Sequence, residues 1–436
     1  MPACNDVHPW IASLDDVFSP FGKNILLFLA LVSILIVIPD PKSWNDESRL
    51  AAIESVVERG TLVIDNSTFV GTGDKIFVNG HFYSDKTPLS SLMGAVVYFP
   101  LHMLGFRLSQ DASVAYYCIT FFTVKALWIL SLLAFHATLG LMRGNPATRA
   151  VHTLAFGLAS IHLSWSTVYN NHSLAASLIT IAFHFYMRSR QTGRPARDMF
   201  VSGFLFSLAG NIDVPTTAFY ATFLVLILLD ASRRKHVTHY LLPCLILAIP
   251  ALAMNYSITG GFGPLQTDPS YFDYPGSPWK GAEKLSGTEM NSLPFFLSYA
   301  LNCLFGRRGF LVYNPLLLAF IAHLVRGMFG RTDFRKESIG IGITSAVVML
   351  YYFLYTSNYG GESYSIRWFV PLLPLLYLGG YGFFANFCGL KKKAFALVFA
   401  ASVCISAIGM INPWAGSTWS QTPLIDNVLS LFHALS

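Results

Sequence analysis

Long apolar runs that are almost free of charge constrain this chain more than any other feature of its sequence. Hydrophobic residues make up 53% of its 436 residues and charged residues only 12%, whereas roughly a quarter of a soluble domain is charged. The runs Ile25–Ile38, Ile341–Tyr355 and Ala394–Ile411 approach the length of a bilayer crossing. The pattern predicts an all-α, polytopic bundle of transmembrane helices, with residues 1–436 forming one integral membrane domain.

Clusters of Lys and Arg predict which loops face the cytoplasm, because short cytoplasmic loops are enriched in these residues. With every cluster placed inside, the later apolar runs alternate in direction without conflict. The clusters are Arg143 with Arg149; Arg188, Arg190, Arg194 and Arg197; Arg233, Arg234 and Lys235; Arg326, Arg331, Arg335 and Lys336; and Lys391–Lys393. This map predicts about 11–13 spans. Between Pro88 and Leu141 it leaves two alternatives: one segment is re-entrant, or the second is split into two short crossings.

The same map places two long segments outside, residues 39–87 and 257–307. In the first, apolar residues recur at three- and four-residue spacing between Asp46 and Arg59. This spacing predicts an amphipathic helix that can lie on the membrane surface, with Gly60 as its stop. Thr61–Tyr83 is rich in turn residues and predicts a hairpin or loop.

Charged residues at these outer positions are the first candidates for chemistry. Asp46 and Glu47 open the predicted helix, where a carboxylate either caps the helix or acts as a general base at the interface. Lys86 precedes a span on the outer side, so it either snorkels to the interface or holds a lipid phosphate.

Three further arginines lie outside against the positive-inside tendency. Arg367 either pairs with Glu362 or joins Arg307 and Arg308 in holding an anion at the outer interface. With Lys86, they form a predicted binding set for a donor phosphate.

Polar groups in the shorter outer segments complete the candidates. Asn171 and His172 join two spans, and Asp213 lies between two apolar runs. His172 either has a structural hydrogen-bonding role or contacts a substrate, and ionisable groups at membrane depth are functional candidates by default. Glu362 and Tyr364 lie in a glycine-containing loop. All five are predicted to bind an acceptor or a sugar.

The first outer loop resembles that of the GT-C superfamily of membrane glycosyltransferases. Within it, the loop is most similar to bacterial protein O-mannosyltransferase-like and aminoarabinose transferase-like enzymes. That family opens the loop with an acidic pair in a W..DE.RYA-type stretch, and a KPPL-type segment leads into the next span. The matching residues here are Trp44–Ala51 and Asp85–Leu89. Thr87 stands where proline is usual, and Asn170-Asn171-His172 stands where a second acidic residue is frequent.

The resemblance implies many helices with an active site in an outer cavity. It implies that Asp46 is the general base that takes the proton of an acceptor hydroxyl, that Glu47 supports it, and that Lys86 contacts the phosphate of a lipid-linked donor. The implied function is transfer of a monosaccharide from a polyprenyl-phosphate-linked donor, on the outward face of a bacterial inner membrane. The acceptor is a glycan, a lipid or a protein, and no nucleic acid is expected as a partner.

Two points stay open at this stage. A transporter or flippase for a lipid-linked sugar or another amphipathic anion would use a similar basic rim, although charges near the midplane and repeated halves are more typical of transporters. The proposed chemistry requires no cofactor, but a pair of carboxylates can also bind a divalent metal.

Overall fold

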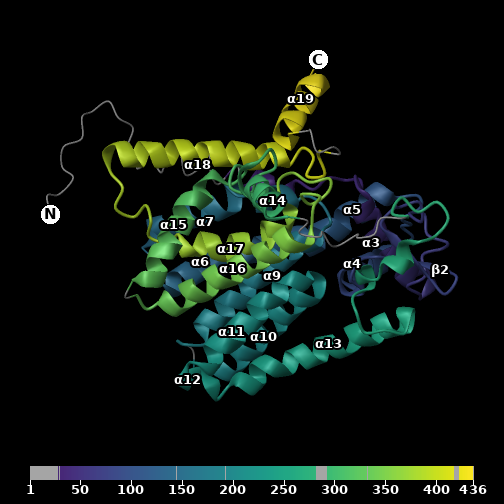
Figure 1. The fold of residues 1–436 in the computed structure, drawn as a ribbon, viewed down its shortest axis with the longest axis horizontal. Coiled ribbons are helices and arrows are strands. Elements are labelled where there is room, and N and C mark those ends of the chain that lie inside the picture. The colour runs from purple at the N-terminus through teal and green to yellow at the C-terminus, as the bar shows by residue number, and fades with distance from the viewer. Residues whose placement is uncertain are drawn as a thin grey trace.

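A computed structural model of the protein describes residues 28, 30–143, 145–191, 193–280, 292–330, 332–416 and 422–435. The predicted first span, Ile25–Ile38, therefore lies partly outside the described residues. Long helices run side by side along the longest axis, and smaller elements gather at one end (Figure 1). The described secondary structure is helical apart from one two-stranded hairpin and an isolated bridge, which confirms the predicted all-α class.

The elements follow one another in three groups. The first group is α3 (Trp44–Arg59), β1 (Lys75–Val78), β2 (His81–Ser84) and α4 (Pro88–Met103). The second is α5 (Ala112–Thr120), η1 (Phe121–Lys125), α6 (Ala126–Leu141), α7 (Pro146–Leu158), α8 (His162–Trp165), α9 (Asn171–Arg188), α10 (Pro195–Ile212), η2 (Val214–Thr216), α11 (Thr217–Leu228), α12 (Ala231–Arg234) and α13 (Val237–Thr259). The third is η3 (Leu265–Thr267), η4 (Pro269–Phe272), α14 (Leu293–Phe305), α15 (Pro315–Phe329), α16 (Arg335–Tyr355), η5 (Arg367–Leu372), α17 (Leu373–Gly379), α18 (Gly389–Gly409) and α19 (Pro423–Leu435).

Four helices among the described residues are long and apolar enough to cross a membrane. They are the continuous Ala112–Leu141 helix, α13, α16 and α18. Shorter apolar helices cover Val214–Leu228, Leu293–Phe305, Pro315–Phe329 and Arg367–Gly379. The total of about 11–13 crossings stays a prediction, since it came from hydropathy and charge alone.

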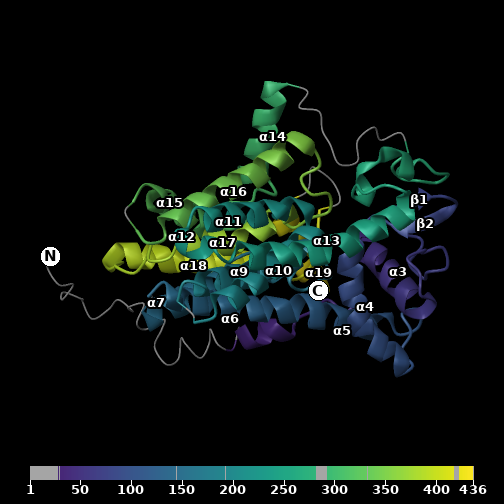
Figure 2. The same ribbon diagram turned by 90° about the horizontal axis from the view of Figure 1, so that it is seen from below.

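The ambiguous stretch from Pro88 to Leu141 has a simple arrangement. α5, η1 and α6 join into one helix of 30 residues. The preceding helix, α4, packs instead against α3 at one end of the bundle (Figure 2). Gly94 lets the two helices approach, because a Cβ there would collide with Ile53. The second segment is therefore not split into two crossings.

α3 ends at the predicted residue but begins two residues before the predicted Asp46, and its polar residues are more buried than predicted. Its N-cap is Ser43, whose side chain accepts from the Asn45 N–H, and its last turn closes on Gly60 at φ 68°, where glycine is favoured. Polar residues such as Asp46, Arg49 and Glu54 are buried along with its apolar face. Most of α3 is thus packed against neighbouring elements, and its placement at a membrane surface stays a prediction.

The two predicted outer loops dock against each other. The hairpin turns at Asn79-Gly80, with φ 53° and 87°, as the tight turn of a two-residue hairpin requires. Trp279 of the second loop donates its indole N–H to Gly73 O at 2.9 Å and meets the Trp44 ring edge-on at 6.3 Å. The two loops together form one wall of the cavity described below.

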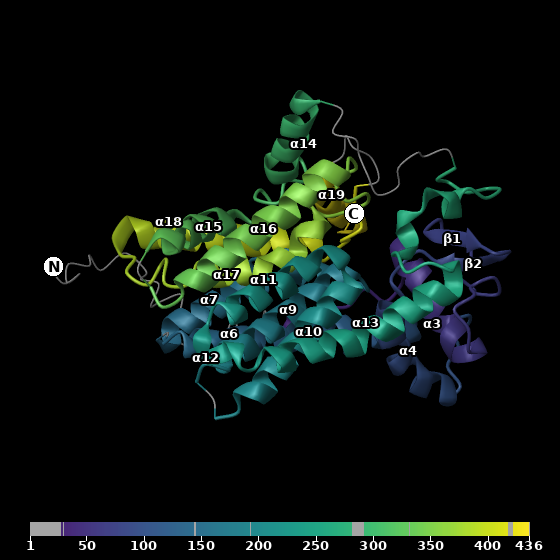
Figure 3. The ribbon, with the colours of Figure 1, turned by 60° about the horizontal axis from the view of Figure 1, so that its bottom comes forward.

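The positive clusters lie at the end of the bundle opposite α3 and the β1–β2 hairpin. Figures 1 and 3 both place α12, the α15–α16 turn and the start of α18 at one end, and α3 with the hairpin at the other. Arg190 forms an ion pair with buried Glu337 at 2.5 Å, and Arg233 lies 3.8 Å from the same carboxylate. The alternation predicted from the charges agrees with this arrangement.

Candidate active site

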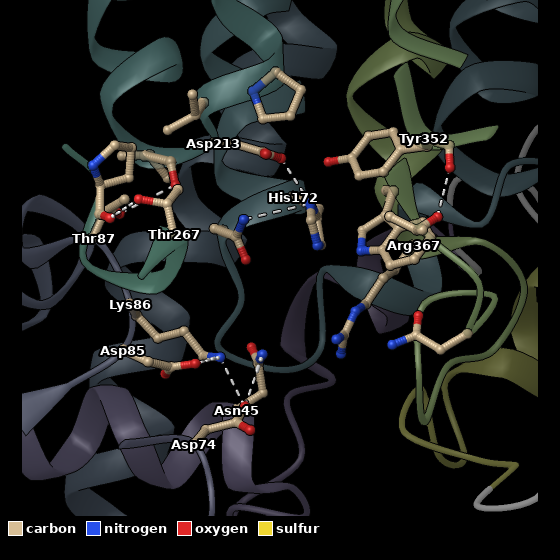
Figure 4. Close-up of a pocket in the computed structure, with 18 of the residues that line it drawn as sticks. Asn45, Asp74, Asp85, Lys86, Thr87, His172, Asp213, Thr267, Tyr352 and Arg367 are labelled. Atoms are coloured by element: carbon tan, nitrogen blue, oxygen red, sulfur yellow. Dashed lines mark hydrogen bonds and ion pairs between the residues drawn. The ribbon is translucent and has the colours of Figure 1, made fainter. Parts of the chain in front are cut away.

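A cavity of about 360 Å³ opens between α3 with its neighbouring hairpin and the ends of the bundle helices. Its ionisable lining residues come from several elements far apart in the chain: Arg49, Asp74, Asp85, Lys86, His172, Asp213, Tyr351, Tyr352 and Arg367. A second cavity of about 760 Å³ shares Asn45, Asp74 and Arg367 with the first. The two cavities therefore adjoin, and Figure 4 shows residues that line the first of them.

Lys86 lies between two carboxylates of the cavity wall. Its Nζ is 2.8 Å from Asp74 Oδ2 and 2.9 Å from Asp85 Oδ2. Burial favours the neutral form of Asp74, but Lys86, Arg367 and Arg49 together outweigh burial and lower the pKa of Asp74 below its usual value. Burial raises the pKa of Asp85, with Lys86 opposing it. The lysine is therefore already neutralised in part by its neighbours.

Two arginines face the same space without such neutralisation. Arg49 donates to Asn45 O at 2.8 Å and to Asn171 Oδ1 at 2.7 Å. Arg367 lies over the Trp414 ring at 4.9 Å and donates to Glu362 O at 3.5 Å. Within the described ranges, neither guanidinium forms an ion pair with a carboxylate, and the Nε of each is buried without a hydrogen-bond partner. An anion entering the cavity would find these donors unoccupied by carboxylates.

His172 and Asp213 meet on another part of the wall. Nδ1 of His172 lies 2.7 Å from Asp213 Oδ2. Nearby, Tyr352 stacks on Trp368 with centroids 4.7 Å apart and planes 4° apart. Flat aromatic faces beside polar groups are suited to contacts with a sugar ring or a lipid.

The predicted base, Asp46, does not line either cavity. Its side chain is fully buried, and Oδ2 accepts from the Lys42 N–H at 3.2 Å. Oδ1 is buried with no hydrogen-bond partner among the described residues. Burial raises the pKa of Asp46 to about 7, with Lys42 and Arg49 opposing the rise. Glu47 does line the second cavity, and burial followed by the charge of Asp74 raises its pKa.

The other predicted residues divide between the site and the scaffold. Glu362 lines the second cavity, and Asn171 lines the first. Arg308 also lines the second cavity, but its guanidinium donates to the backbone oxygens of Gly361 and Gly416.

Arg307 and Tyr364 do not reach the site. Arg307 is exposed and lines neither cavity. Tyr364 is fully buried, and its hydroxyl donates to Ile405 O at 2.7 Å. The sequence placed both in the right outer segments, but it does not show which way a side chain points.

Arg49, Asp74 and Asn45 are among the residues of the site that were missed as candidates. Arg49 lies in the stretch Trp44–Ala51 that carries the resemblance and follows Asp46 by three residues, so its proximity to the acidic pair was available from helical spacing. Asp74 reaches the cavity only because the loop folds back onto α3, where the Asn45 amide approaches it at 3.5 Å. No local signal predicts that contact.

The carboxylates of the cavity do not converge on a metal site. Over the described residues, no group of three or more His, Cys, Asp or Glu side chains is placed to hold a metal ion. Asp74 and Asp85 share Lys86, and Asp213 is paired with His172. The cation between Asp74 and Asp85 is the Lys86 ammonium.

The arrangement of helices is shared with solved membrane glycosyltransferases. ArnT from Cupriavidus metallidurans matches in the apo state with TM-score 0.58 and 15% identity, over 94% of this chain and 68% of ArnT. Its structure bound to undecaprenyl phosphate matches with TM-score 0.55 and 14% identity over the same shares. The Archaeoglobus fulgidus oligosaccharyltransferase in the apo form matches with TM-score 0.57 and 12% identity, over 96% of this chain and 60% of that protein.

These likenesses confirm the fold that the first outer loop predicted. No protein-family model and no curated protein matches the sequence. The chain has the fold of the GT-C membrane glycosyltransferases, and with its membrane-length apolar helices it is an integral membrane protein.

Proposed function

We propose that the protein is a glycosyltransferase that moves a monosaccharide from a polyprenyl-phosphate-linked donor to an acceptor hydroxyl. The observation that carries the proposal is the set of three cations, Arg49, Lys86 and Arg367, around one polar cavity at the end of the bundle opposite the positive clusters. By the charge map, this end faces the periplasm or the extracellular side of a bacterial inner membrane.

A lipid-linked donor suits this position. The outer face has no pool of nucleotide sugars, whereas a polyprenyl tail partitions into the bilayer and leaves its phosphate at the interface. The neighbours in fold support this choice, since ArnT was solved bound to undecaprenyl phosphate and the Archaeoglobus fulgidus enzyme AglB was solved in complex with a dolichol-phosphate.

The three cations would bind and stabilise the leaving group. When the bond between the anomeric carbon and the phosphate oxygen breaks, a second negative charge develops on the phosphate. Preorganised guanidinium and ammonium donors stabilise such charge in a site with little water. A single displacement by the acceptor oxygen would invert the configuration of the anomeric carbon.

Displacement also needs a base for the acceptor proton. The resemblance to the family assigns this role to Asp46, with Glu47 in support. A base must come within about 2.6–3.2 Å of the proton-bearing atom, so the buried Asp46 carboxylate would first have to turn out of the wall. Glu47 and Glu362 line the second cavity and are suited to binding the acceptor.

A transfer assay tests the proposal. Purified protein is incubated with undecaprenyl-phosphate-linked hexoses and pentoses and with a serine- and threonine-rich peptide, a glycolipid and an oligosaccharide as acceptors. Release of undecaprenyl phosphate together with a glycosylated acceptor is the expected result. Movement of the intact lipid-linked sugar between leaflets of a proteoliposome, without release, would instead support a flippase.

A further inference from the structure

His172 and Asp213 come from different helices and meet in the cavity wall. His172 is the second residue of α9, and Asp213 is the C-cap of α10. Their side chains are 8% and 4% exposed, and the Nδ1 to Oδ2 distance is 2.7 Å. Figure 4 shows the imidazole near the centre of the view, with the Asp213 carboxylate above it and Arg367 to its lower right.

The geometry fixes which nitrogen of His172 is available. The contact with Asp213 at 2.7 Å is much shorter than the 3.5 Å contact of the same nitrogen with the Asn171 amide. A carboxylate at Nδ1 keeps the proton on that nitrogen and leaves the lone pair of Nε2 free. Among the described residues no group is hydrogen-bonded to Nε2, so it is left to the cavity.

Other buried histidines of the bundle differ at this point. His152 directs Nε2 at Tyr377 O at 2.7 Å, and His162 directs Nε2 at Ser173 O at 3.3 Å. Each is held in place by a backbone carbonyl and lines neither cavity. His172 combines burial, an orienting carboxylate and a ring nitrogen that faces open space.

We propose that His172 is the general base of the transfer and that Asp213 is the residue that positions it. The inference rests on the proposed function. It differs from the assignment of Asp46, whose carboxylate lines neither cavity, whereas both members of this pair line the same cavity as Arg49, Lys86 and Arg367.

The reaction balances with these groups alone. The acceptor oxygen forms a bond to the anomeric carbon while its proton passes to Nε2 of His172. The bond from the anomeric carbon to the phosphate oxygen breaks, and its electron pair leaves with polyprenyl phosphate. Asp213 stabilises the imidazolium that forms, as a carboxylate does for a catalytic histidine. The imidazolium then returns its proton to water on the outer side.

Burial lowers the pKa of His172. Asp213 opposes this fall because it favours the protonated ring, and Arg367 and Arg49 add to it. Removing the carboxylate would therefore lower the pKa of the base as well as release the ring.

Two variants test the proposal in the transfer assay, with the donor and acceptor that the wild type uses. His172→Gln should lower kcat by about 10²- to 10⁴-fold and leave the affinity for undecaprenyl phosphate within about twofold. Asp213→Asn should lower kcat less and move the acid limb of the kcat profile to lower pH, which a purely structural role would not do. His81→Gln is the matched control, because His81 makes the same 2.7 Å contact with Asp65 and lines neither cavity. It should keep full activity.

Chemical rescue guards against a variant that merely misfolds. His172→Ala removes the ring beside an open cavity, and added imidazole should restore part of its activity but none of the activity lost in Arg367→Ala.

The outcomes separate the inference from the function on which it rests. If the wild type transfers sugar and His172→Gln does so equally well, or if only Asp46→Asn loses transfer, the base is not His172. If the wild type releases undecaprenyl phosphate from no donor, the proposed function fails and the inference fails with it.

Discussion

At the scale of single residues, the cavity holds cations in two electrostatic states. Lys86 is paired with Asp74 and Asp85, whereas Arg49 and Arg367 have no carboxylate partner among the described residues. A phosphate would gain most from the two guanidinium groups, and it would compete with two carboxylates for the ammonium. Asp74 therefore weakens the site for an anion even though it holds Lys86 in place.

This difference predicts opposite effects on the binding of undecaprenyl phosphate. Arg367→Ala and Lys86→Ala should each weaken binding by about 10- to 100-fold, the range expected for losing a charged hydrogen bond. Asp74→Asn should tighten it, because it removes a negative charge and releases the ammonium. Native mass spectrometry of the purified variants measures each affinity, with the exposed Arg307→Ala as the control. Unchanged binding in both cation variants would remove these residues from the phosphate site.

Asp46 predicts a dependence of stability on pH. Burial raises its pKa from 3.8 to about 7, so the folded state binds the proton more tightly than the unfolded state. Its contribution to stability is complete below pH 3.8 and is lost as the pH rises through about 7. Each pKa unit corresponds to about 1.4 kcal/mol.

Asp46→Asn should therefore match the wild type in stability at low pH and exceed it at pH 8. The asparagine oxygen keeps the bond from Lys42 N–H and carries no charge. Melting temperatures in detergent at pH 5 and pH 8 measure the difference. If the difference in melting temperature between the variant and the wild type is the same at pH 5 and pH 8, burial does not disfavour the charged form of Asp46.

Much of the site could be predicted residue by residue, but not its geometry. Glu47, Lys86, Asn171, His172, Asp213, Arg308, Glu362 and Arg367 all line one of the two cavities. Short outer segments at the ends of apolar runs must lie near one another, which is why charge and topology were enough to find them. Tertiary packing decides which way the side chains of Asp46 and Tyr364 point, and it brings Asp74 into the cavity wall. Residue spacing in the sequence does not predict either result.

At the scale of elements, two helices of the bundle pack with their backbones close together where a small residue lies between them. α10 packs closely on α13, and Gly203 lies where a Cβ would collide with the carbonyl oxygen of Tyr240. Small residues at helix contacts are typical of membrane bundles.

Gly203→Ala should therefore destabilise the fold by about 1–3 kcal/mol, the usual cost of overpacking. Thermal unfolding in detergent measures this change. Gly71→Ala is the control, since a Cβ at Gly71 meets nothing within 4 Å. Equal melting temperatures for both variants would show that α10 can move away from α13 without loss.

The elements were predicted with uneven success for physical reasons. Gly60 correctly predicted a helix end, and Asn79-Gly80 correctly predicted a hairpin turn. Both positions have positive φ, a backbone conformation that few residue types other than Gly and Asn adopt. α4 and the long α5–α6 helix both have apolar sequences, so hydropathy alone did not show that one packs on α3 and the other runs through the bundle.

For the whole molecule, the proposed function requires that the end with the cavity faces out. The cavity and the clusters of Lys and Arg lie at opposite ends of the bundle. In a cysteine-free background, Glu362→Cys should react in intact cells with a maleimide that cannot cross the membrane. Lys393→Cys should react only after the cells are opened. The reverse pattern would place the cavity in the cytoplasm.

The central claim is that the outer cavity holds the phosphate of a polyprenyl lipid. Cryo-electron microscopy of the protein with undecaprenyl phosphate tests it most directly. We expect phosphate density among Arg49, Lys86 and Arg367, with the lipid tail leading from the cavity into the membrane. Density for the phosphate elsewhere on the protein, with this cavity filled only by water at saturating lipid, would contradict it.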